Sequence, residues 1–121
     1  MKTILVAEDN DSNYILMTYI LRGHYNVARA HNGQEALDVV ARGGIDLVLM
    51  DVKMPVMDGL EATRRLKETH PALPVIALTA NVFDNDRDSA MEAGCDEFLA
   101  KPVNSKLCLE TIARCLEGAA A

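Results

Sequence analysis

The chain has 121 residues, half of them apolar, and carries 18 acidic against 12 basic side chains, for a formal net charge of −6. Its size and apolar content predict a single domain over residues 1–121, while its acidic balance argues against direct DNA binding and against binding to an anionic membrane surface. No apolar run approaches the ~20 residues of a membrane span and no signal-peptide core follows Met1, which predicts a cytoplasmic protein.

Strand-like and helix-like patterns alternate along the whole chain. Apolar runs typical of β-strands occur at about 3–7, 25–29, 46–50, 74–78 and 96–100. Amphipathic stretches follow them at about 12–22, 34–42, 59–69, 85–93 and 105–117. We therefore predict five βα units and a frayed, disordered tail at 118–121. We expect Ser12 or Asp11 to cap the first helix and Asn104 or Ser105 to cap the last.

The strand-like runs are apolar at nearly every position, which is typical of parallel strands covered by helices on both faces. With right-handed crossovers, five βα units can be wound in only a few ways, and the flavodoxin-like order 2-1-3-4-5 is among the commonest. We therefore expect an α/β, doubly wound (βα)5 fold with a five-stranded parallel sheet in that order. In this order the second and third strands lie on opposite sides of the first. A crevice then opens between the ends of the first and third strands.

The three cysteines have no metal-ligand spacing and form an odd set: Cys95, Cys108 and Cys115. A disulfide framework is not expected in a chain with so large an apolar fraction. Buried free cysteine behaves as a small apolar residue. We therefore predict three reduced thiols that serve in packing.

Four of the strand-like runs lead directly into residues that phosphoryl chemistry can use. Glu8 and Asp9 follow the first run, Asp51 the third, Thr79 the fourth and Lys101 the fifth. Ligand sites in open α/β sheets lie beyond the carboxyl ends of the strands. If the strands are parallel, all five residues therefore meet at one edge of the sheet.

Three carboxylates brought close together repel one another, and such a cluster either takes up a proton or binds a cation. Without a neighbouring histidine or cysteine, Glu8, Asp9 and Asp51 suit Mg²⁺, which prefers oxygen ligands. A carboxylate beside Mg²⁺ can attack phosphorus, and we expect Asp51 to be this nucleophile. Lys101 and Thr79 would stabilise phosphoryl oxygens. Each element alone is an ordinary turn, strand end or loop, and the prediction depends on their occurring together.

Four segments resemble the receiver domain of two-component response regulators: Val6–Asn10 (VAEDN), Leu49–Gly59 (LMDVKMPVMDG), Ala77–Ala80 (ALTA) and Phe98–Pro102 (FLAKP). The resemblance covers essentially the whole chain. It implies that Asp51 accepts a phosphoryl group from a phosphohistidine. It also implies that Asp9 and Asp51 bind Mg²⁺, that Glu8 holds the ion largely through water, and that the carbonyl of Lys53 completes the protein ligands.

The resemblance assigns further residues to the phosphorylated state. Thr79, the backbone amide of Ala80 and the amine of Lys101 would bind the phosphoryl oxygens, and the Lys101–Pro102 peptide bond would be cis. Phosphorylation would draw Thr79 toward the phosphate and let Phe98 turn inward. This would switch the surface formed by the helix, strand and helix expected at 85–93, 96–100 and 105–117. The protein would be a signalling switch rather than an enzyme, although it would take phosphoryl groups from small donors and hydrolyse its own phosphoaspartate.

The implied partners are a sensor histidine kinase or a histidine phosphotransfer protein, and a downstream protein target. We expect a monomer that can dimerise on phosphorylation. Because Met1 directly precedes the first strand, we favour a stand-alone regulator similar to DivK or to the chemotaxis regulators. A receiver excised from a hybrid histidine kinase is the alternative. Asn13, Tyr14 and Met17, with Pro102 and Val103, are expected to form the docking surface for the phosphodonor helix.

Two other functions are weighed against this one. Haloacid-dehalogenase-type phosphatases also use a Mg²⁺-bound aspartate, but they need a second aspartate two residues further on, where this chain has Lys53. A flavodoxin would need a phosphate-binding first turn, and residues 8–12 are acidic. Lys53 instead suggests a hypothesis within the receiver family, in which it screens the phosphoaspartate from water. Asn81 occupies the companion position after Thr79.

Overall fold

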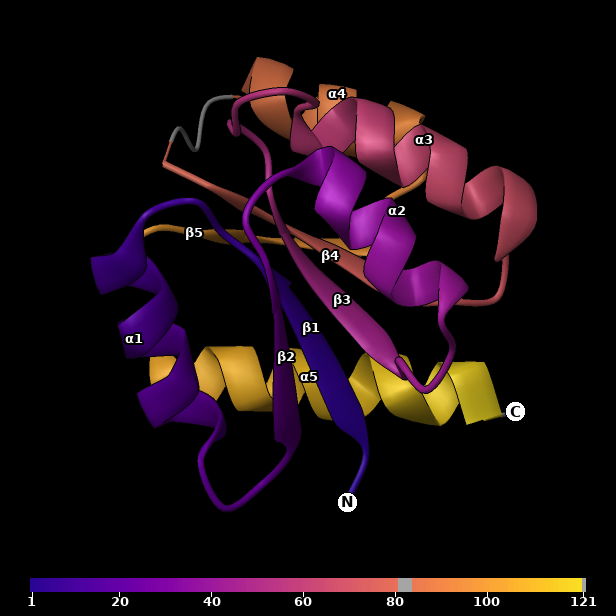
Figure 1. The fold of residues 1–121 in the computed structure, drawn as a ribbon. Helices are drawn as coiled ribbons and strands as arrows, with labels where there is room; N and C mark the ends of the chain where they lie inside the picture. Colours follow the sequence, from indigo (N-terminus) through magenta and orange to yellow (C-terminus); the bar gives the residue numbers. More distant parts are fainter. Residues whose placement is uncertain (81–83, 121) are drawn as a thin grey trace.

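The computed structural model describes residues 1–80 and 84–120 and consists of five strands that alternate with five helices (Figure 1). The strands are β1 (Thr3–Ala7), β2 (Asn26–Ala30), β3 (Leu47–Asp51), β4 (Val75–Thr79) and β5 (Glu97–Ala100). The helices are α1 (Asp11–Leu21), α2 (Gly33–Ala41), α3 (Gly59–Thr69), α4 (Asp84–Ala93) and α5 (Ser105–Ala120). The predicted order of elements is confirmed.

The strands form one parallel sheet in the order β2-β1-β3-β4-β5, as predicted for a flavodoxin-like fold. Strands β2, β3 and β4 each begin and end one residue later than the pattern indicates. Asp51 is paired with Leu78 in the β3–β4 ladder, so it is the last residue of β3 rather than the first residue of the loop. β1 pairs with β2 on one side and with β3 on the other, so the acidic ends of β1 and β3 lie side by side.

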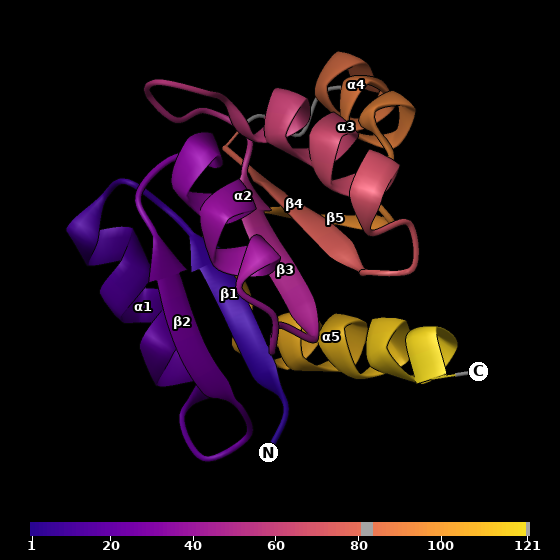
Figure 2. The same ribbon diagram turned by 45° about the vertical axis from the view of Figure 1, so that its right-hand side comes forward.

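Helices cover both faces of the sheet, with α1 and α5 on one face and α2, α3 and α4 on the other (Figures 1 and 2). Two apolar cores result, because strand side chains alternate between the faces. In β1, Ile4 and Val6 pack into the core under α1 and α5, and Leu5 and Ala7 into the core under α2 and α3. This explains why the strands are apolar at nearly every position.

Asparagine and aspartate side chains cap four helix starts. Asn10 caps α1 by accepting a hydrogen bond from the backbone N–H of Asn13 at 3.0 Å, so neither Ser12 nor Asp11 is the cap. Asn104 accepts a bond from the N–H of Leu107 at 2.9 Å, as predicted for the last helix. The remaining two caps are the side chains of Asn32 and Asp58. Each occupies a strand-to-helix loop on the side of the sheet that carries the acidic strand ends.

The last helix extends further than the sequence pattern indicates. Helix α5 ends at Ala120, so residues 118–120 are helical, where a frayed tail is predicted. An alanine-rich segment propagates a helix readily once the preceding turns are formed. None of the helices within residues 1–80 and 84–120 is long and apolar enough to cross a membrane.

Candidate functional site

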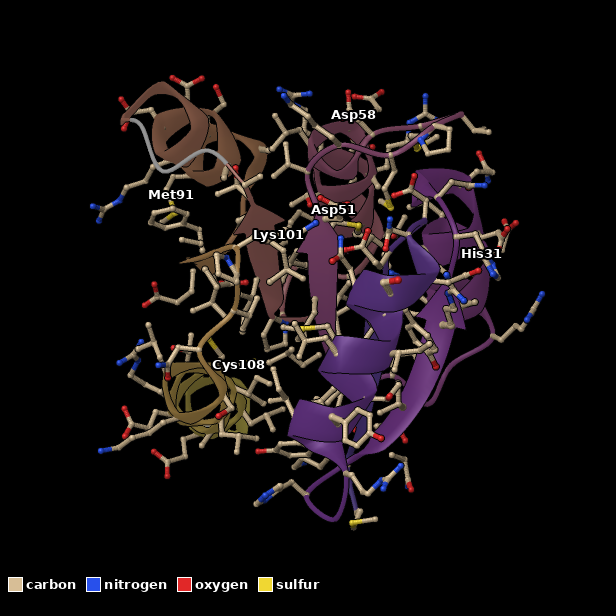
Figure 3. All side chains as sticks on the ribbon, turned by 90° about the vertical axis from the view of Figure 1, so that its left-hand side faces the viewer. His31, Asp51, Asp58, Met91, Lys101 and Cys108 are labelled. Carbon is tan, nitrogen blue, oxygen red and sulfur yellow. The ribbon has the colours of Figure 1, made fainter. Side chains whose placement is uncertain are left out.

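The five residues that the strand-end pattern identifies lie together at the carboxyl edge of the sheet. Asp51 and Thr79 are the last residues of β3 and β4, and Glu8, Asp9 and Lys101 directly follow β1 and β5. Figure 3 shows Asp51 and Lys101 side by side at this edge, between α1 and α3. The convergence follows from the parallel sheet, which brings the ends of all its strands to one side.

Lys101 forms the electrostatic centre of the site. Its Nζ atom lies 2.9 Å from Oε1 of Glu8 and 3.2 Å from Oδ1 of Asp51. Glu8 is only 1% exposed and Asp51 is 6% exposed, so both carboxylates are largely desolvated. A buried carboxylate requires a partner of opposite charge. One lysine therefore serves two acids that come from different strands.

The buried charges shift one another's protonation. Burial raises the pKa of the Glu8 carboxyl, and its hydrogen bond with Asp51 raises it further, while Lys101 lowers it. Burial also works to lower the pKa of Lys101, but the hydrogen bond to Glu8 and the charges of Asp51 and Glu8 outweigh it, so this pKa is raised. Lys101 is therefore a permanent cation at neutral pH, whereas Glu8 is a weakened acid.

The residues present fit a divalent cation. Glu8, Asp9 and Asp51 each place one carboxylate oxygen within 4.8 Å of the others. Asp9 is exposed, so the cluster faces solvent on one side. Lys101 offsets only one of the three negative charges, and the charge that remains favours a hard cation with oxygen ligands.

A small hollow of about 120 Å³ lies beside the Asp51 carboxylate, and it is lined by Asp51, Val52, Lys53, Thr79, Ala80 and Lys101. Every residue expected to bind a phosphoryl group is in this lining. The backbone N–H of Lys53 donates to Oδ1 of Asp51 at 3.3 Å, which orients the carboxylate. The peptide bond between Lys101 and Pro102 is cis, as predicted.

The loop between β3 and α3 is held tightly against the acidic strand end. A Cβ atom at Gly59 would overlap the carbonyl oxygen of Asp51, so only glycine permits this approach. The Gly59 N–H donates to the carbonyl of Val52 at 2.9 Å and closes the loop. Val56 at the loop tip has a φ of +68° and is 84% exposed. A β-branched residue in the left-handed region is strained.

Phe98 is partly buried on β5, and the guanidinium carbon of Arg87 on α4 lies 5.7 Å from the centre of its ring. A cation placed over an aromatic face is attracted to it. This contact couples the predicted switch residue to α4. Asn81, the predicted companion of Lys53, lies outside the described residues.

Four of the five residues of the expected docking surface line one hollow, and Met17 is the buried one among them. Met17 is 2% exposed and packs in the core under α1 and α5, although it also lines a hollow of about 60 Å³ with Asn13, Pro102 and Val103. The exposed apolar side chains of α1 are instead Ile15, Leu16 and Tyr19. Helical spacing alone could not decide which side of α1 faces the sheet, because this helix is apolar on most of its circumference.

Sequence patterns also missed Arg29, on the edge strand β2. Its guanidinium contacts the turn that carries Glu8 and Asp9, donating to the Glu8 carbonyl and pairing with Asp11. The available signal was a charged residue among the apolar residues at the end of a strand.

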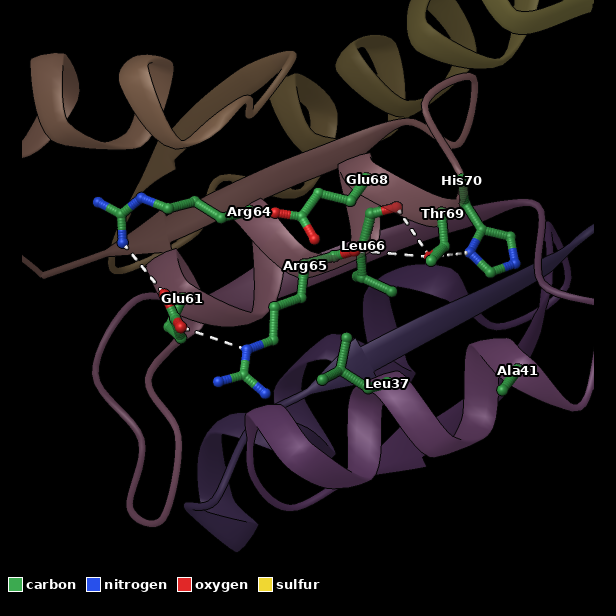
Figure 4. A pocket seen from close by; sticks show the side chains of 9 residues that line it. All are labelled: Leu37, Ala41, Glu61, Arg64, Arg65, Leu66, Glu68, Thr69 and His70. Carbon is green, nitrogen blue, oxygen red and sulfur yellow. Dashed lines mark hydrogen bonds and ion pairs between the residues drawn. The ribbon is translucent and has the colours of Figure 1, made fainter.

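A larger hollow of about 560 Å³ lies between α2 and α3, away from the carboxyl edge of the sheet (Figure 4). Leu37 and Leu66 contribute its apolar lining, and Glu61 on its rim pairs with Arg64 at 3.5 Å and with Arg65 at 3.2 Å. It contains none of the residues expected to carry chemistry. The smaller hollow beside Asp51 is therefore the candidate site.

Comparison with known proteins agrees with this geometry. A family profile described as the response regulator receiver domain matches residues 4–113. The polar-differentiation response regulator DivK of Brucella anthropi is 35% identical over 114 residues, which cover 92% of this chain and 93% of DivK.

Two solved structures are similar in fold and sequence. One is the receiver domain of a sensor histidine kinase from Pseudomonas aeruginosa, with a magnesium ion coordinated in its active-site cleft (TM-score 0.89, 34% identity, 96% of this chain and 98% of that chain). The other is the Saccharomyces cerevisiae receiver domain of Ssk1, solved with the histidine phosphotransfer protein Ypd1 (TM-score 0.86, 31% identity, 92% and 86%). Sequence, topology and the acidic crevice agree, and the chain belongs to the response regulator receiver domain family of two-component signalling.

Proposed function

We propose that this protein is a phosphorylation switch in which Asp51 accepts a phosphoryl group from a phosphohistidine. The observation that carries the proposal is the position of the Asp51 carboxylate. It lies beside a hollow of about 120 Å³, with the Lys101 ammonium 3.2 Å away. A nucleophile next to a fixed cation suits phosphoryl transfer, because catalysis there consists mainly of positioning and charge stabilisation.

Mg²⁺ is the cofactor that the acidic cluster fits. Asp9 and Asp51 would ligate it directly, Glu8 largely through water, and the Lys53 carbonyl would complete the protein ligands. The related kinase receiver with magnesium in its cleft supports this assignment. When bound, the ion would offset the negative charges of the carboxylate and the phosphoryl group.

The transfer step follows from the positions of the side chains. An Asp51 oxygen forms a bond to phosphorus as the bond between phosphorus and the donor imidazole nitrogen breaks. The electron pair of that bond stays on the nitrogen, so a phosphohistidine protonated on its other ring nitrogen leaves as neutral histidine, and Asp51 becomes an acyl phosphate. Lys101 then binds a phosphoryl oxygen, and the Thr79 hydroxyl and Ala80 amide bind the others. All three residues line the same hollow.

The output would be a change of surface. Thr79 moves toward the phosphate, and Phe98 turns inward into the space that Thr79 leaves, which alters the face formed by α4, β5 and α5. In the present state the Arg87 guanidinium lies over the Phe98 ring. Inward rotation of Phe98 has to break this contact. The contact between Arg87 and Phe98 therefore stabilises the resting state. The altered face would bind a downstream protein or a second copy of this chain.

The phosphodonor would be a sensor histidine kinase or a histidine phosphotransfer protein. The Ssk1 receiver was solved with such a phosphotransfer protein, which supports this class of partner. Ile15 and Leu16 on α1, with Pro102 beside the crevice, offer it an exposed contact. We favour a stand-alone regulator because the response regulator DivK of Brucella anthropi is 35% identical to this chain over 114 residues. A kinase-attached receiver is the second candidate, which the kinase receiver from Pseudomonas aeruginosa favours.

The proposal is tested by intact mass after incubation with acetyl phosphate, with and without Mg²⁺. We expect the native chain to gain one phosphoryl group only when Mg²⁺ is present, and Asp51→Asn to gain none. Asp38→Asn is the matched control, because it makes the same chemical change at an exposed residue of α2. A native chain that gains no mass would refute the proposal. Steady release of phosphate from a phosphomonoester would instead favour the phosphatase.

Lys53 would set how long the phosphoryl group persists. Its side chain is exposed at the mouth of the hollow beside Asp51, where it can screen attacking water. We expect Lys53→Ala to hydrolyse its phosphoaspartate faster, as followed by the decay of the phosphorylated mass after donor removal. An unchanged rate would show that the side chain has no such role.

A further inference from the structure

Arg29 contacts the turn that carries Glu8 and Asp9 and the start of α1. Its Nη2 atom donates to the Glu8 carbonyl oxygen at 3.2 Å and lies 2.8 Å from Oδ1 of Asp11. The guanidinium carbon lies 4.3 Å from the ring centre of Tyr14 on the second turn of α1. The guanidinium therefore bridges the end of β1 and the first two turns of α1, from a strand 21 residues further along the chain from Glu8.

We propose that Arg29 is a positioning residue for the metal site, which fixes the acidic turn so that Asp9 can bind Mg²⁺. The inference rests on the proposed function and deepens it. Asp9 stands between the two anchored residues, Glu8 and Asp11, and among the described residues its carboxylate has no hydrogen-bonding or ionic partner. Its position therefore depends on the backbone on either side of it.

The Glu8 side chain is held by a separate set of contacts. Lys101 binds its Oε1 atom at 2.9 Å, and the N–H of Asn10 lies 3.3 Å from its Oε2 atom. These contacts place the Glu8 carboxylate but do not reach that of Asp9. Arg29 acts on the main chain at Glu8 and on the side chain of Asp11, so its contribution is distinct from that of Lys101.

The contacts at this position suit arginine better than lysine. A planar guanidinium can donate in two directions while its face stacks on an aromatic ring, whereas an ammonium is a point charge with no face. The Arg29 side chain is 19% exposed, so most of it is shielded from solvent. A lysine would keep the positive charge but could not bridge the carbonyl, the carboxylate and the ring together.

The precision of the turn matters because Mg²⁺ requires near-octahedral geometry with ligands at about 2.0–2.1 Å. Outer-shell residues that orient metal ligands typically change metal affinity by about 10- to 100-fold when they are removed. A positive charge near the site acts in the opposite direction, since it repels the cation. Positioning and charge therefore predict Mg²⁺ affinities that change in opposite senses when Arg29 is neutralised.

The test is calorimetric titration of the folded, metal-free protein with MgCl₂, which needs no phosphoryl donor. We expect Arg29→Met to bind Mg²⁺ about tenfold more weakly, and Arg29→Lys to be weakened as well because it lacks the fork. Arg22→Met is the matched control. Arg22 lies over the Tyr19 ring at 5.0 Å, at the opposite end of α1 from the acidic turn, and its loss should leave the affinity unchanged.

A charge-neutral pair of variants at Tyr14 gives an independent measurement. Tyr14→Leu removes the ring on which Arg29 stacks, and we expect Mg²⁺ affinity to fall by roughly threefold, the scale of an exposed cation–π contact. Tyr14→Phe keeps the ring and should bind Mg²⁺ like the native chain. Neither change alters the charge near the site, so a difference between them reports positioning. Urea unfolding of every variant shows whether stability alone has changed.

The results distinguish a failure of the inference alone from a failure of the proposed function. A native chain that binds no Mg²⁺ would refute both. If the native chain binds Mg²⁺ and Arg29→Met binds it equally well or more tightly, the positioning role is overturned and the proposed function stands. If Arg29→Lys matched the native affinity, the guanidinium fork and its stacking on Tyr14 would not be needed to position Asp9, and the role assigned to the arginine would likewise be overturned.

Discussion

The Asp51→Asn variant removes one of the three carboxylates that share the crevice, and we expect the metal-free protein to be more stable as a result. In the native chain the oxygens of Glu8 and Asp9 lie within 4.8 Å of that of Asp51. Folding brings these charges together, whereas the unfolded chain keeps them apart in water. Asparagine has a similar shape and no charge, so it keeps the packing and removes the repulsion.

The magnitude is a balance of opposed terms. At an effective dielectric constant of about 20, each repulsion between Asp51 and a carboxylate at the 4.8 Å limit costs about 3.5 kcal/mol. The attraction to Lys101 at 3.2 Å, which the variant also loses, is about 5 kcal/mol on the same scale. Solvent screens the exposed Asp9, while relief of Asp51's own desolvation favours the variant. We expect a net stabilisation of about 1 kcal/mol.

The assay is urea unfolding in EDTA, with Asp38→Asn as the control for the general effect of lowering the net negative charge. Asp38 is exposed on α2, where its side chain accepts a hydrogen bond from Gln34. Titration with Mg²⁺ should then reverse the order of stability. The native chain gains about 1.4 kcal/mol for each tenfold excess of Mg²⁺ over its dissociation constant, whereas a variant lacking a ligand gains less.

Two results would refute this reasoning. If Asp51→Asn were no more stable than Asp38→Asn in EDTA, repulsion in the crevice would not be a significant cost of folding. If Mg²⁺ stabilised Asp51→Asn as much as the native chain, Asp51 would not be a metal ligand.

Three further predictions concern the backbone and the thiols. Val56→Asn should stabilise the protein by about 1 kcal/mol in urea unfolding, because asparagine tolerates the left-handed backbone and the 84% exposed valine contributes little burial. An equal gain in Val56→Ala would count against backbone strain as the cause. Gly33→Ala should destabilise the protein by about 2 kcal/mol, because its Cβ would overlap a carbonyl oxygen of the β3–α3 loop. Gly118→Ala is the control on α5, where the added Cβ enters open space and should not destabilise the protein. Half-buried Cys115 should react first with a disulfide reagent at pH 8. Burial raises the pKa of Cys108 to about 11 and should protect that thiol until the protein unfolds. Equal reaction rates for all thiols would contradict this prediction.

Much of the fold and of the site could be predicted from local patterns. Five apolar runs and five amphipathic stretches predicted the βα units to within one or two residues at most boundaries, because hydrophobic period and strand length are local properties. The same patterns placed Asp51 and Thr79 at strand ends. Where the pattern was ambiguous, it failed: α1 is apolar on most of its circumference, so the buried Met17 could not be told from the exposed Leu16.

The sequence by itself determined which chemical groups stand at the strand ends, since each is encoded by its own neighbours. Only the tertiary structure decided which of these groups touch. Lys101 meets Glu8 across 93 positions of sequence, and Arg29 meets the acidic turn across 21, because strand order and the reach of long side chains set these distances. Local periodicity contains no information about such contacts, and they are the ones that turn a row of strand ends into a site.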